Sequence, residues 1–329
     1  MIRNLPLVSI VIPNYNYARF LTRRFRTVLA QDFHDYEIIF LDDASNDGSI
    51  EVALDSFGKY INIAYTSNVN SGNPFIQWNR GVELSRGKYI WIAEADDECE
   101  PHFLERTVQV MEESPEVLIV YCHTLPIDQE SRILDPSFYL DYVSELDRLR
   151  WRSDFIADGS QEVRKYLSRK NTITNVSGVL FRRASYMEAG GAPESLRMCG
   201  DWITYCRILR KGSIAYISEP LNYHRQHPAN HTSNSVLDLS YFSEFLYVQE
   251  YIGNAFNLNE DEKDRAFFRF LREWDRLTIS SYGRINLYNT YRLAKIAFSY
   301  HNKLSRDTLI AGHMVINVVK SLMAKWKRN

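Results

Sequence analysis

The sequence predicts an α/β domain with a mostly parallel sheet flanked by helices, followed by a helical C-terminal extension. Two observations predict this fold class. Short apolar, β-branched runs alternate with amphipathic segments over about the first 125 residues, and helical periodicity dominates beyond residue 240. The chain has 329 residues, of which 45% are hydrophobic, so it can bury a sizeable core. It contains no run near 18 consecutive apolar residues, which disfavours a polytopic membrane protein.

The strand and helix pairs repeat along the first part of the chain. Apolar runs predict five strands, over 7–12, 36–41, 61–65, 89–93 and 118–122. Helical spacing predicts a helix after each of the first four, over 18–31, 50–57, 75–84 and from Pro101 onward. The pattern loosens to about residue 170, which we interpret as an insertion or flexible cover. Residues 171–183 predict another strand, and 201–210 predict a helix with Gly200 or Asp201 as N-cap.

Charge separates the two regions of the chain, and we place the boundary near 239. Residues 1–239 carry 25 basic and 32 acidic residues, whereas 240–329 carry 14 and 9. Residues 284–329 contain nine basic residues and a single acidic one, Asp307. Such a tail suits an anionic membrane surface as well as nucleic acid. We expect no nucleic acid partner.

The last predicted helix has an apolar side and a basic fringe. The apolar side is formed by Ile310, Met314, Val318, Leu322 and Trp326, and the fringe by Lys320, Lys325, Lys327 and Arg328. The alternatives are packing against the first domain, a homodimer contact, or attachment to a membrane surface. The N-terminal MIRNLPLVSIVIP enters a predicted strand without a small-residue cleavage site. We therefore expect a cytoplasmic protein, peripheral on the inner membrane face if the helix binds lipid.

Acidic residues follow the predicted strands. The first strand leads into PNYN, the second into Asp42-Asp43, and the fourth into Glu94-Ala95-Asp96-Asp97. In open parallel sheets, ligands bind beyond the carboxyl ends of the strands. Carboxylates gathered there repel one another unless a cation lies among them. Oxygen ligands favour Mg²⁺ or Mn²⁺, and such ions commonly bind substrate phosphates as well. The pattern therefore predicts a metal-bound diphosphate. Neither GxxxxGK[ST] nor a GxGxxG after the first strand occurs, which disfavours ATPase and NAD functions.

Four segments resemble a known family. VSIVIPNYN, IIFLDDASNDGS, SRGKYIWIAEADDECEP and CGDWITYCRIL are similar, in order and separation, to the four motifs of family 2 glycosyltransferases with the GT-A fold, such as those of bacterial polysaccharide biosynthesis. The resemblance covers roughly residues 6–235. It implies a nucleotide-diphosphate-sugar donor, a divalent metal and inversion at the anomeric carbon.

The resemblance also implies roles for the donor-binding residues. Pro13 and Tyr15 match positions that line the base pocket. Asp43 matches the carboxylate that accepts a hydrogen bond from the uracil or thymine imide, and Asp42 is its neighbour and a further candidate. Taken alone, Asp42-Asp43 could also be a polar turn that caps a helix.

The resemblance implies that the acidic loop provides the metal ligands and that the later motif provides the catalytic base. Asp96 falls where the second aspartate of the family's DXD pattern holds the metal, and Asp97 is expected to ligate it directly or through water. Glu94 replaces the first aspartate, which keeps a carboxylate able to reach ribose hydroxyls. Asp201 matches the catalytic base, although an aspartate there could also be a helix cap.

Three further residues are candidates for diphosphate or acceptor contacts. Arg225 and His227 lie in NYHRQHPANHT, where many relatives have a basic or histidine segment near the diphosphate. His227 and His231 are alternatively ordinary loop histidines. Trp202 either stacks on an acceptor sugar or is a core residue.

These residues predict an inverting, metal-dependent glycosyltransferase. We expect it to move a hexose, with a UDP-sugar favoured over a dTDP-sugar, to a glycan or lipid-linked acceptor in surface polysaccharide assembly. The alternatives are a catalytically silent scaffold that binds nucleotide sugar and a sugar nucleotidylyltransferase. The missing glycine-rich loop after the first strand disfavours the nucleotidylyltransferase.

Overall fold

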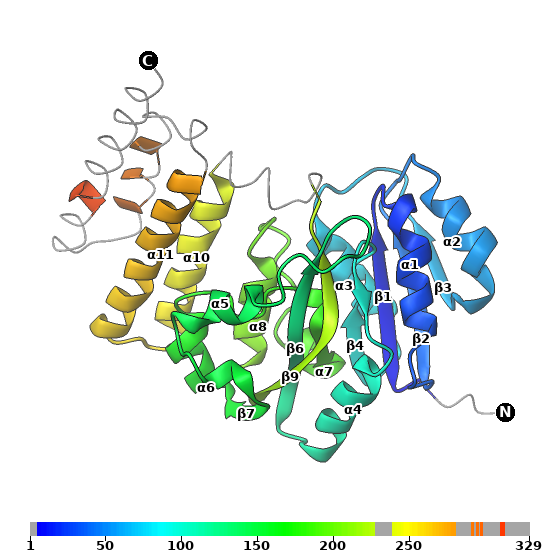
Figure 1. Cartoon of the computed structure of the whole chain (residues 1–329), viewed down its shortest axis with the longest axis horizontal. Helices are drawn as coiled ribbons and strands as arrows, with labels where there is room; N and C mark the ends of the chain where they lie inside the picture. Colours follow the sequence, from blue (N-terminus) through cyan, green and yellow to red (C-terminus); the bar gives the residue numbers. More distant parts are fainter. Residues whose placement is uncertain are drawn as a thin grey trace. The chain divides into compact units, whose positions relative to one another are not determined.

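A computed structural model of the chain describes residues 5–227, 239–280, and the short stretches 291–292, 294–295, 297–298 and 310–312 (Figure 1). The chain divides into two compact units. The first contains residues 1–162 and 172–227, and the second contains residues 163–171 and 228–329. The second unit thus includes a short segment from well before the boundary expected near 239.

The first half of the sheet in unit 1 is parallel, as predicted. Its strands lie in the order β3-β2-β1-β4. The elements are β1 (Val8–Asn14), α1 (Ala18–Leu29), β2 (Tyr36–Asp42), α2 (Ser49–Phe57), β3 (Ile63–Thr66), α3 (Pro74–Leu84) and β4 (Tyr89–Ile92). Each apolar run became a strand and each amphipathic segment a helix, because burial on both faces of a parallel sheet favours continuous apolar strands.

The other half of the sheet is mixed. Beyond β4 the strand order continues β8-β6-β9-β5, and β7 also pairs with β9. Strand β8 is antiparallel to both of its neighbours, β4 and β6. Strand β9 is parallel to β6. These strands are β5 (Glu98–Cys99), β6 (Val117–Ile127), β7 (Phe155–Asp158), β8 (Val179–Arg182) and β9 (Ser213–Arg225). Of the segment predicted as a strand over 171–183, only the last part, β8, forms one. The prediction missed β9, whose apolar pattern is interrupted where the pairing shifts register near Pro220.

Three of the remaining helical elements of unit 1, at 138–144, 150–152 and 159–162, fall in the region expected to be an insertion, and the others lie outside it. These remaining elements are the 3₁₀ turns at Gly58–Tyr60, Arg150–Arg152 and Val176–Gly178, and the helices α4 (Phe103–Glu113), α5 (Phe138–Ser144), α6 (Gly159–Glu162), α7 (Arg183–Glu188) and α8 (Gly200–Ile208). Buried Tyr139 and Trp151 fix this region against the sheet: Tyr139 lies 6.0 Å from the ring of Tyr216, and the Trp151 indole donates to the Tyr121 hydroxyl at 2.7 Å. The N-cap of α8 is Cys199, one residue before the predicted position.

Helices cover both faces of the sheet, and the alternation of strand side chains decides which face each residue meets. Even-numbered residues of β1 join one core cluster with α1, α2 and α4, whose members include Val8, Ile10, Ile12, Leu21, Phe25, Ala53 and Leu104. Val11 points to the opposite face, where α3 packs. The contact with α3 is close because Gly81 has no side chain. A Cβ on Gly81 would lie 2.2 Å from Cγ1 of Val11 and 3.1 Å from Cδ1 of Leu41.

Unit 2 is helical over its described part. It contains α10 (Ser240–Ala255), α11 (Glu260–Ser280) and the turn Val163–Leu167, and the helical prediction for these two C-terminal segments is confirmed. The rings of Phe242 and Phe245 lie 6.1 and 5.8 Å from that of Phe270, and Arg164 pairs with Glu262 at 2.7 Å. Most of the last predicted helix, including Met314 to Trp326, lies outside the described residues. Within the described part, no helix is long and apolar enough to cross a membrane.

We expect Gly81→Ala to destabilise the protein, because its new methyl group meets Val11 of β1 and Leu41 of β2 beneath α3. Overpacking of this kind costs about 1–3 kcal/mol. Urea unfolding followed by circular dichroism measures the loss. Gly58→Ala is the control, since nothing lies within 4 Å of a Cβ at that position. Equal stability of the two variants would contradict the close packing of α3 on β1.

Candidate active site

The carboxyl ends of β1 and β2 bring Asn14 and Asp42 together. The two residues are register partners, and the Asn14 amide donates to Oδ1 of Asp42 at 2.7 Å. Oδ2 of Asp42 accepts from the backbone N–H of Ser45 at 2.9 Å, and the side chain is fully buried. Asp42 thus shapes the turn after β2. Pro13 is buried near the end of β1, whereas Tyr15, just after this strand, is 41% exposed.

Asp43 is held by three donors, two from Ser71 in the loop before α3 and one from Gln77 in α3. Its Oδ2 accepts from the backbone N–H and the hydroxyl of Ser71, at 2.9 and 2.7 Å, and its Oδ1 accepts from the Gln77 amide at 2.7 Å. The carboxylate is 5% exposed. These partners fix the orientation of Asp43. Sequence reasoning missed Ser71 and Gln77, because SNVNSGNP indicates only a loop and Gln77 looks like an ordinary helix residue.

The acidic loop after β4, which contains Glu94, Asp96 and Asp97, is hydrogen-bonded to α3 and α1. The Trp78 indole N–H donates to Oε1 of Glu94 at 2.8 Å, and Nε of the buried Arg24 donates to the Glu94 carbonyl at 2.8 Å. Burial, assisted by the negative charge of Asp96, raises the pKa of Glu94 to about 8, against the lowering effect of the Trp78 hydrogen bond.

Asp97 points into the protein. Its Oδ2 accepts from the Asn175 amide at 2.9 Å and the Ser177 hydroxyl at 2.7 Å, and its Oδ1 accepts from the backbone N–H of Arg225 at 2.9 Å. The side chain is 2% exposed, and burial raises its pKa. In this arrangement Asp97 joins the acidic loop to β9 and to the turn before β8, a structural position that differs from the metal contact expected of it.

Asp96 lies against His227. Oδ2 of Asp96 and Nε2 of His227 are 3.0 Å apart, and the imidazole is 6% exposed. The rings of Tyr17 and Phe20 lie 5.4 and 5.3 Å from the imidazole. Burial and then the negative charge of Asp96 raise the pKa of Tyr17. His227 is therefore part of the acidic cluster and not an isolated loop histidine; His231 lies outside the described residues.

Arg225 supports the acidic loop from beneath. It is fully buried, its Nε donates to the Asp96 carbonyl at 2.7 Å, and its guanidinium pairs with Glu98. A second donor contacts the Asp128 carbonyl at 2.5 Å. The guanidinium is thus occupied by protein groups, which disagrees with its expected place at the diphosphate.

Asp201 is the second residue of α8. Burial, and then the negative charges of Asp201 and Glu94, raise the pKa of Tyr205, which is buried in the same helix. Trp202 is 2% exposed. Of its two predicted roles, burial matches the core residue and leaves no open indole face for a sugar.

Comparison with known proteins decides the family. The model of glycosyl transferase family 2 matches residues 9–186, which is more than half of the chain. The chain belongs to glycosyl transferase family 2.

Relatives of this family 2 glycosyltransferase include proteins of polysaccharide synthesis. An uncharacterized glycosyltransferase of Nostoc is 28% identical over 228 residues, which cover 68% of this chain and 66% of that protein. Chondroitin synthase of Escherichia coli is 24% identical over 249 residues, covering 76% of this chain but only 33% of the synthase.

Solved structures show the same GT-A fold. Staphylococcus aureus TarS in complex with UDP-GlcNAc matches with a TM-score of 0.71 at 14% identity, over 98% of this chain and 92% of that one. The mannosyltransferase PcManGT of Pyrobaculum calidifontis, in complex with GDP-Man and Mn²⁺, matches with a TM-score of 0.57 at 16% identity, over 97% and 88% of the two chains.

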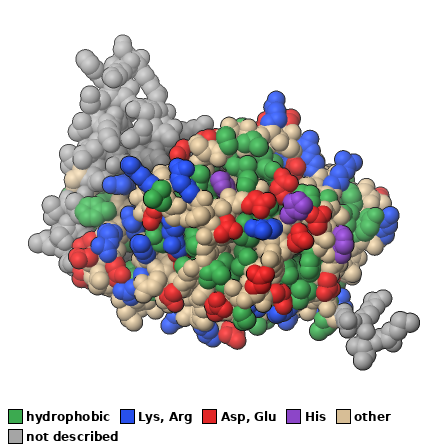
Figure 2. Space-filling model, turned by 60° about the horizontal axis from the view of Figure 1, so that its bottom comes forward, with side chains coloured by type: hydrophobic (Ala, Val, Ile, Leu, Met, Phe, Trp, Pro, Cys, Tyr) green, Lys and Arg blue, Asp and Glu red, His purple; other side chains and the backbone are tan. Residues whose placement is uncertain are grey.

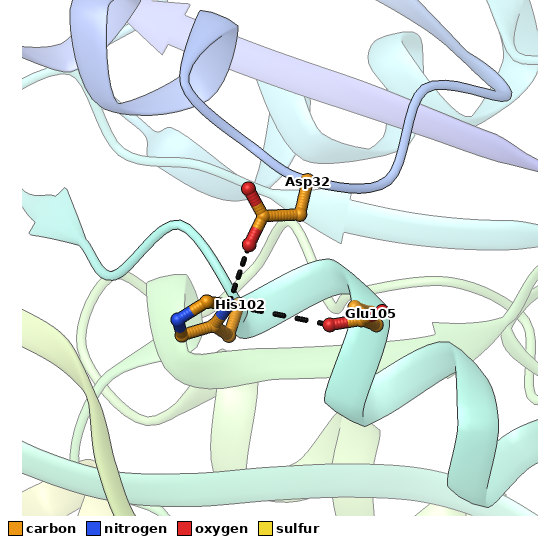
Figure 3. A group of neighbouring side chains, drawn as sticks. All are labelled: Asp32, His102 and Glu105. Atoms are coloured by element: carbon orange, nitrogen blue, oxygen red, sulfur yellow. Dashed lines mark ion pairs between the residues drawn. The ribbon is translucent and has the colours of Figure 1, made fainter.

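A second group of acidic and histidine side chains lies on the surface of this glycosyltransferase (Figure 3). Nδ1 of His102 is 2.5 Å from Oδ2 of Asp32 and 4.0 Å from Oε2 of Glu105. All three residues are exposed. Acidic side chains lie beside histidine and basic ones elsewhere on the surface (Figure 2), so this geometry alone does not indicate a metal site. None of the three belongs to the predicted site.

The raised pKa of Glu94 predicts a pH dependence of stability for the metal-free enzyme. Because the folded state holds this proton more tightly than the unfolded chain, the contribution is present in full below about pH 4.5 and is lost as pH rises through about 8. We expect Glu94→Gln to flatten the decline in the free energy of unfolding between those limits, as measured by urea titrations with EDTA. An unchanged slope would show that other groups cause the decline.

Proposed function

We propose that this glycosyltransferase moves a hexose from a UDP-sugar to a hydroxyl of a glycan or lipid-linked acceptor, with inversion and with a divalent metal. The observation that carries the proposal is the contact between Asp96 and His227, on the same loop as Glu94 and at the same sheet edge as Asp43. The relatives in polysaccharide synthesis support a role in surface glycan assembly.

The side chains at Asp96 fit a divalent cation. Two ligand atoms in adjacent octahedral positions, each about 2.1 Å from the metal, are about 3 Å apart. Asp96 Oδ2 and His227 Nε2 have this separation. The carboxylate suits Mn²⁺ and Mg²⁺ alike, and the imidazole nitrogen favours a first-row transition metal such as Mn²⁺ over Mg²⁺, which is bound mainly by oxygen ligands. When bound there, the metal would neutralise charge on the leaving diphosphate, a Lewis-acid effect worth several kcal/mol.

The donor's base would bind at Asp43. Three hydrogen bonds hold its carboxylate in one orientation, so it can accept from a pyrimidine imide without losing conformational freedom on binding. Tyr15 is exposed and follows Asn14, whose carbonyl accepts from the backbone N–H of Asp43 at 2.9 Å, so its ring is a candidate contact for the base or ribose. The UDP and UDP-GlcNAc complexes of TarS support a uridine donor.

Asp201 would act as the base. It would accept the proton of the acceptor hydroxyl while that oxygen attacks the anomeric carbon and the bond to the diphosphate breaks. Positioned general bases contribute about 10²–10⁴-fold to rate. With one base and no enzyme nucleophile, the displacement is direct and inverts the anomeric centre.

We propose that residues 1–239 contain the catalytic domain and that 240–329 form a helical extension. Every predicted site residue belongs to unit 1, which supports this division, while residues 163–171 and 228–239 group with the helices of unit 2. The basic C-terminal sequence supports attachment to the cytoplasmic membrane face, where a lipid-linked acceptor and a cytosolic nucleotide sugar meet.

The rival function is a silent scaffold that binds nucleotide sugar. The presence of both Asp96 and Asp201 disfavours it. Hydrolysis of UDP-sugars without acceptor, measured with Mn²⁺ and with EDTA, separates the functions. A transferase shows slow, metal-dependent release of UDP, a scaffold shows none, and a nucleotidylyltransferase instead releases pyrophosphate from UTP and sugar phosphate.

We expect Asp201→Asn to lower the transfer rate by at least about 10²-fold, because the amide cannot take the proton. Donor affinity, measured by calorimetry with UDP and Mn²⁺, should stay within about twofold of wild type. Full turnover by this variant would place the base elsewhere.

Mn²⁺ should raise the melting temperature of the wild-type protein in the presence of UDP, by linkage between binding and folding. Asp96→Asn should abolish this rise, because it removes the charged ligand beside His227. Asp32→Asn is the matched control, since it removes a carboxylate from the exposed group with His102. Loss of the rise in Asp32→Asn, with retention in Asp96→Asn, would move the metal to the surface group.

A further inference from the structure

Helix α3 contacts three parts of the proposed site. Gln77 donates to Asp43 and Trp78 donates to Glu94, each through a side chain on the first turns of the helix. The helix also contacts the segment that leads to Asp201. Residues 191–199 of this segment form no regular secondary structure, so their conformation depends on contacts with other elements.

Two asparagines of α3 hold this segment. The Asn73 amide N–H₂ donates to the carbonyls of Glu194 and Leu196, at 2.7 and 2.9 Å, while its Oδ1 caps α3 at the N–H of Phe75. The Asn79 amide donates to the carbonyl of Ala192 and accepts from its N–H, both at 2.9 Å.

A ring of α3 then contacts the start of α8. A Cβ on Gly200 would lie 2.4 Å from Cε2 of Phe75, which is closer than real contacts allow. The Phe75 ring in turn packs edge-on against Trp78, with ring centroids 5.0 Å apart, and is 3% exposed. The Phe75 ring is therefore enclosed between Gly200 and Trp78.

We propose that Asn73, Asn79 and Phe75 are positioning residues for the proposed base, and that α3 thereby sets Asp201 relative to the two donor-binding carboxylates. Gly200 is the residue that makes this possible, because only a glycine lets the first turn of α8 approach the Phe75 ring. The inference rests on the proposed function for Asp201. It predicts that small displacements of α8 reduce transfer while donor binding persists, since an error of about 1 Å in a reacting group can cost about 10²-fold in rate.

The test is a double-mutant cycle at Gly200 and Phe75. Gly200→Ala should lower kcat for transfer at least tenfold while the Kd for UDP with Mn²⁺ stays within twofold of wild type. Phe75→Leu removes the ring edge that the new methyl group meets, so Gly200→Ala with Phe75→Leu should recover most of the lost kcat. A general loss of folding would not be rescued by a second core truncation. Wild-type kcat in Gly200→Ala, or no recovery in the double variant, would overturn the proposal.

Asn73→Asp tests the loop contacts separately. The aspartate keeps the oxygen that caps α3 but replaces the amide donor with an oxygen that faces two carbonyls. We expect faster hydrogen–deuterium exchange over 192–204 and a lower kcat, with UDP affinity kept. Unchanged exchange and kcat would overturn the role of Asn73.

Hydrogen exchange also separates this inference from the proposed function. If the wild-type protein transfers no sugar, the proposed function fails. Faster exchange over 199–204 in Gly200→Ala, reversed by Phe75→Leu, would still support the contact between α3 and α8; exchange equal to wild type would overturn it.

Discussion

The site depends on the way the protein holds a loop of carboxylates that repel one another. Glu94, Asp96 and Asp97 lie within four residues, between β4 and β5. Two buried arginines fix the backbone of the loop: Arg24 donates to the carbonyl of Glu94, and Arg225 to that of Asp96. Hydrogen bonds from a charged guanidinium are stronger than neutral ones, so they hold these two carbonyls firmly. The carboxylate of Asp96 contacts the imidazole of His227.

The same constraint explains why neighbouring acidic residues have different surroundings. Asp97 points inward to Asn175 and Ser177, and Asp42 points inward to Asn14. Each of these carboxylates joins one strand end to another element. Asp96 and Asp43, their neighbours in the sequence, are the carboxylates that we propose to bind ligands.

The parallel half of the fold could be predicted from sequence because each of its strands is a short apolar run followed by a helix. The other half could not be predicted as well. Strand β9 carries Glu219 and Pro220 in its middle, and β8 pairs antiparallel with β4, from which it is separated by almost ninety residues. Pairing between distant segments depends on tertiary contacts that local periodicity does not contain.

The sequence predicts the acidic residues of the proposed site but not their hydrogen-bond partners. A motif shows which side chains carry charge, yet it does not show that Arg225 is buried under the loop or that Trp202 is in the core. The contribution of α3 was also hidden, because Asn73, Gln77 and Trp78 are common helix and cap residues whose neighbours come from distant strands and loops.

Pulsed electron paramagnetic resonance of Mn²⁺ bound together with UDP tests the central claim most directly. We expect a nitrogen coupling from one imidazole and a phosphorus coupling from the diphosphate, with the nitrogen coupling lost in His227→Gln. A spectrum with no nitrogen coupling in the wild-type protein, in the presence of UDP, would contradict a metal held between Asp96 and His227.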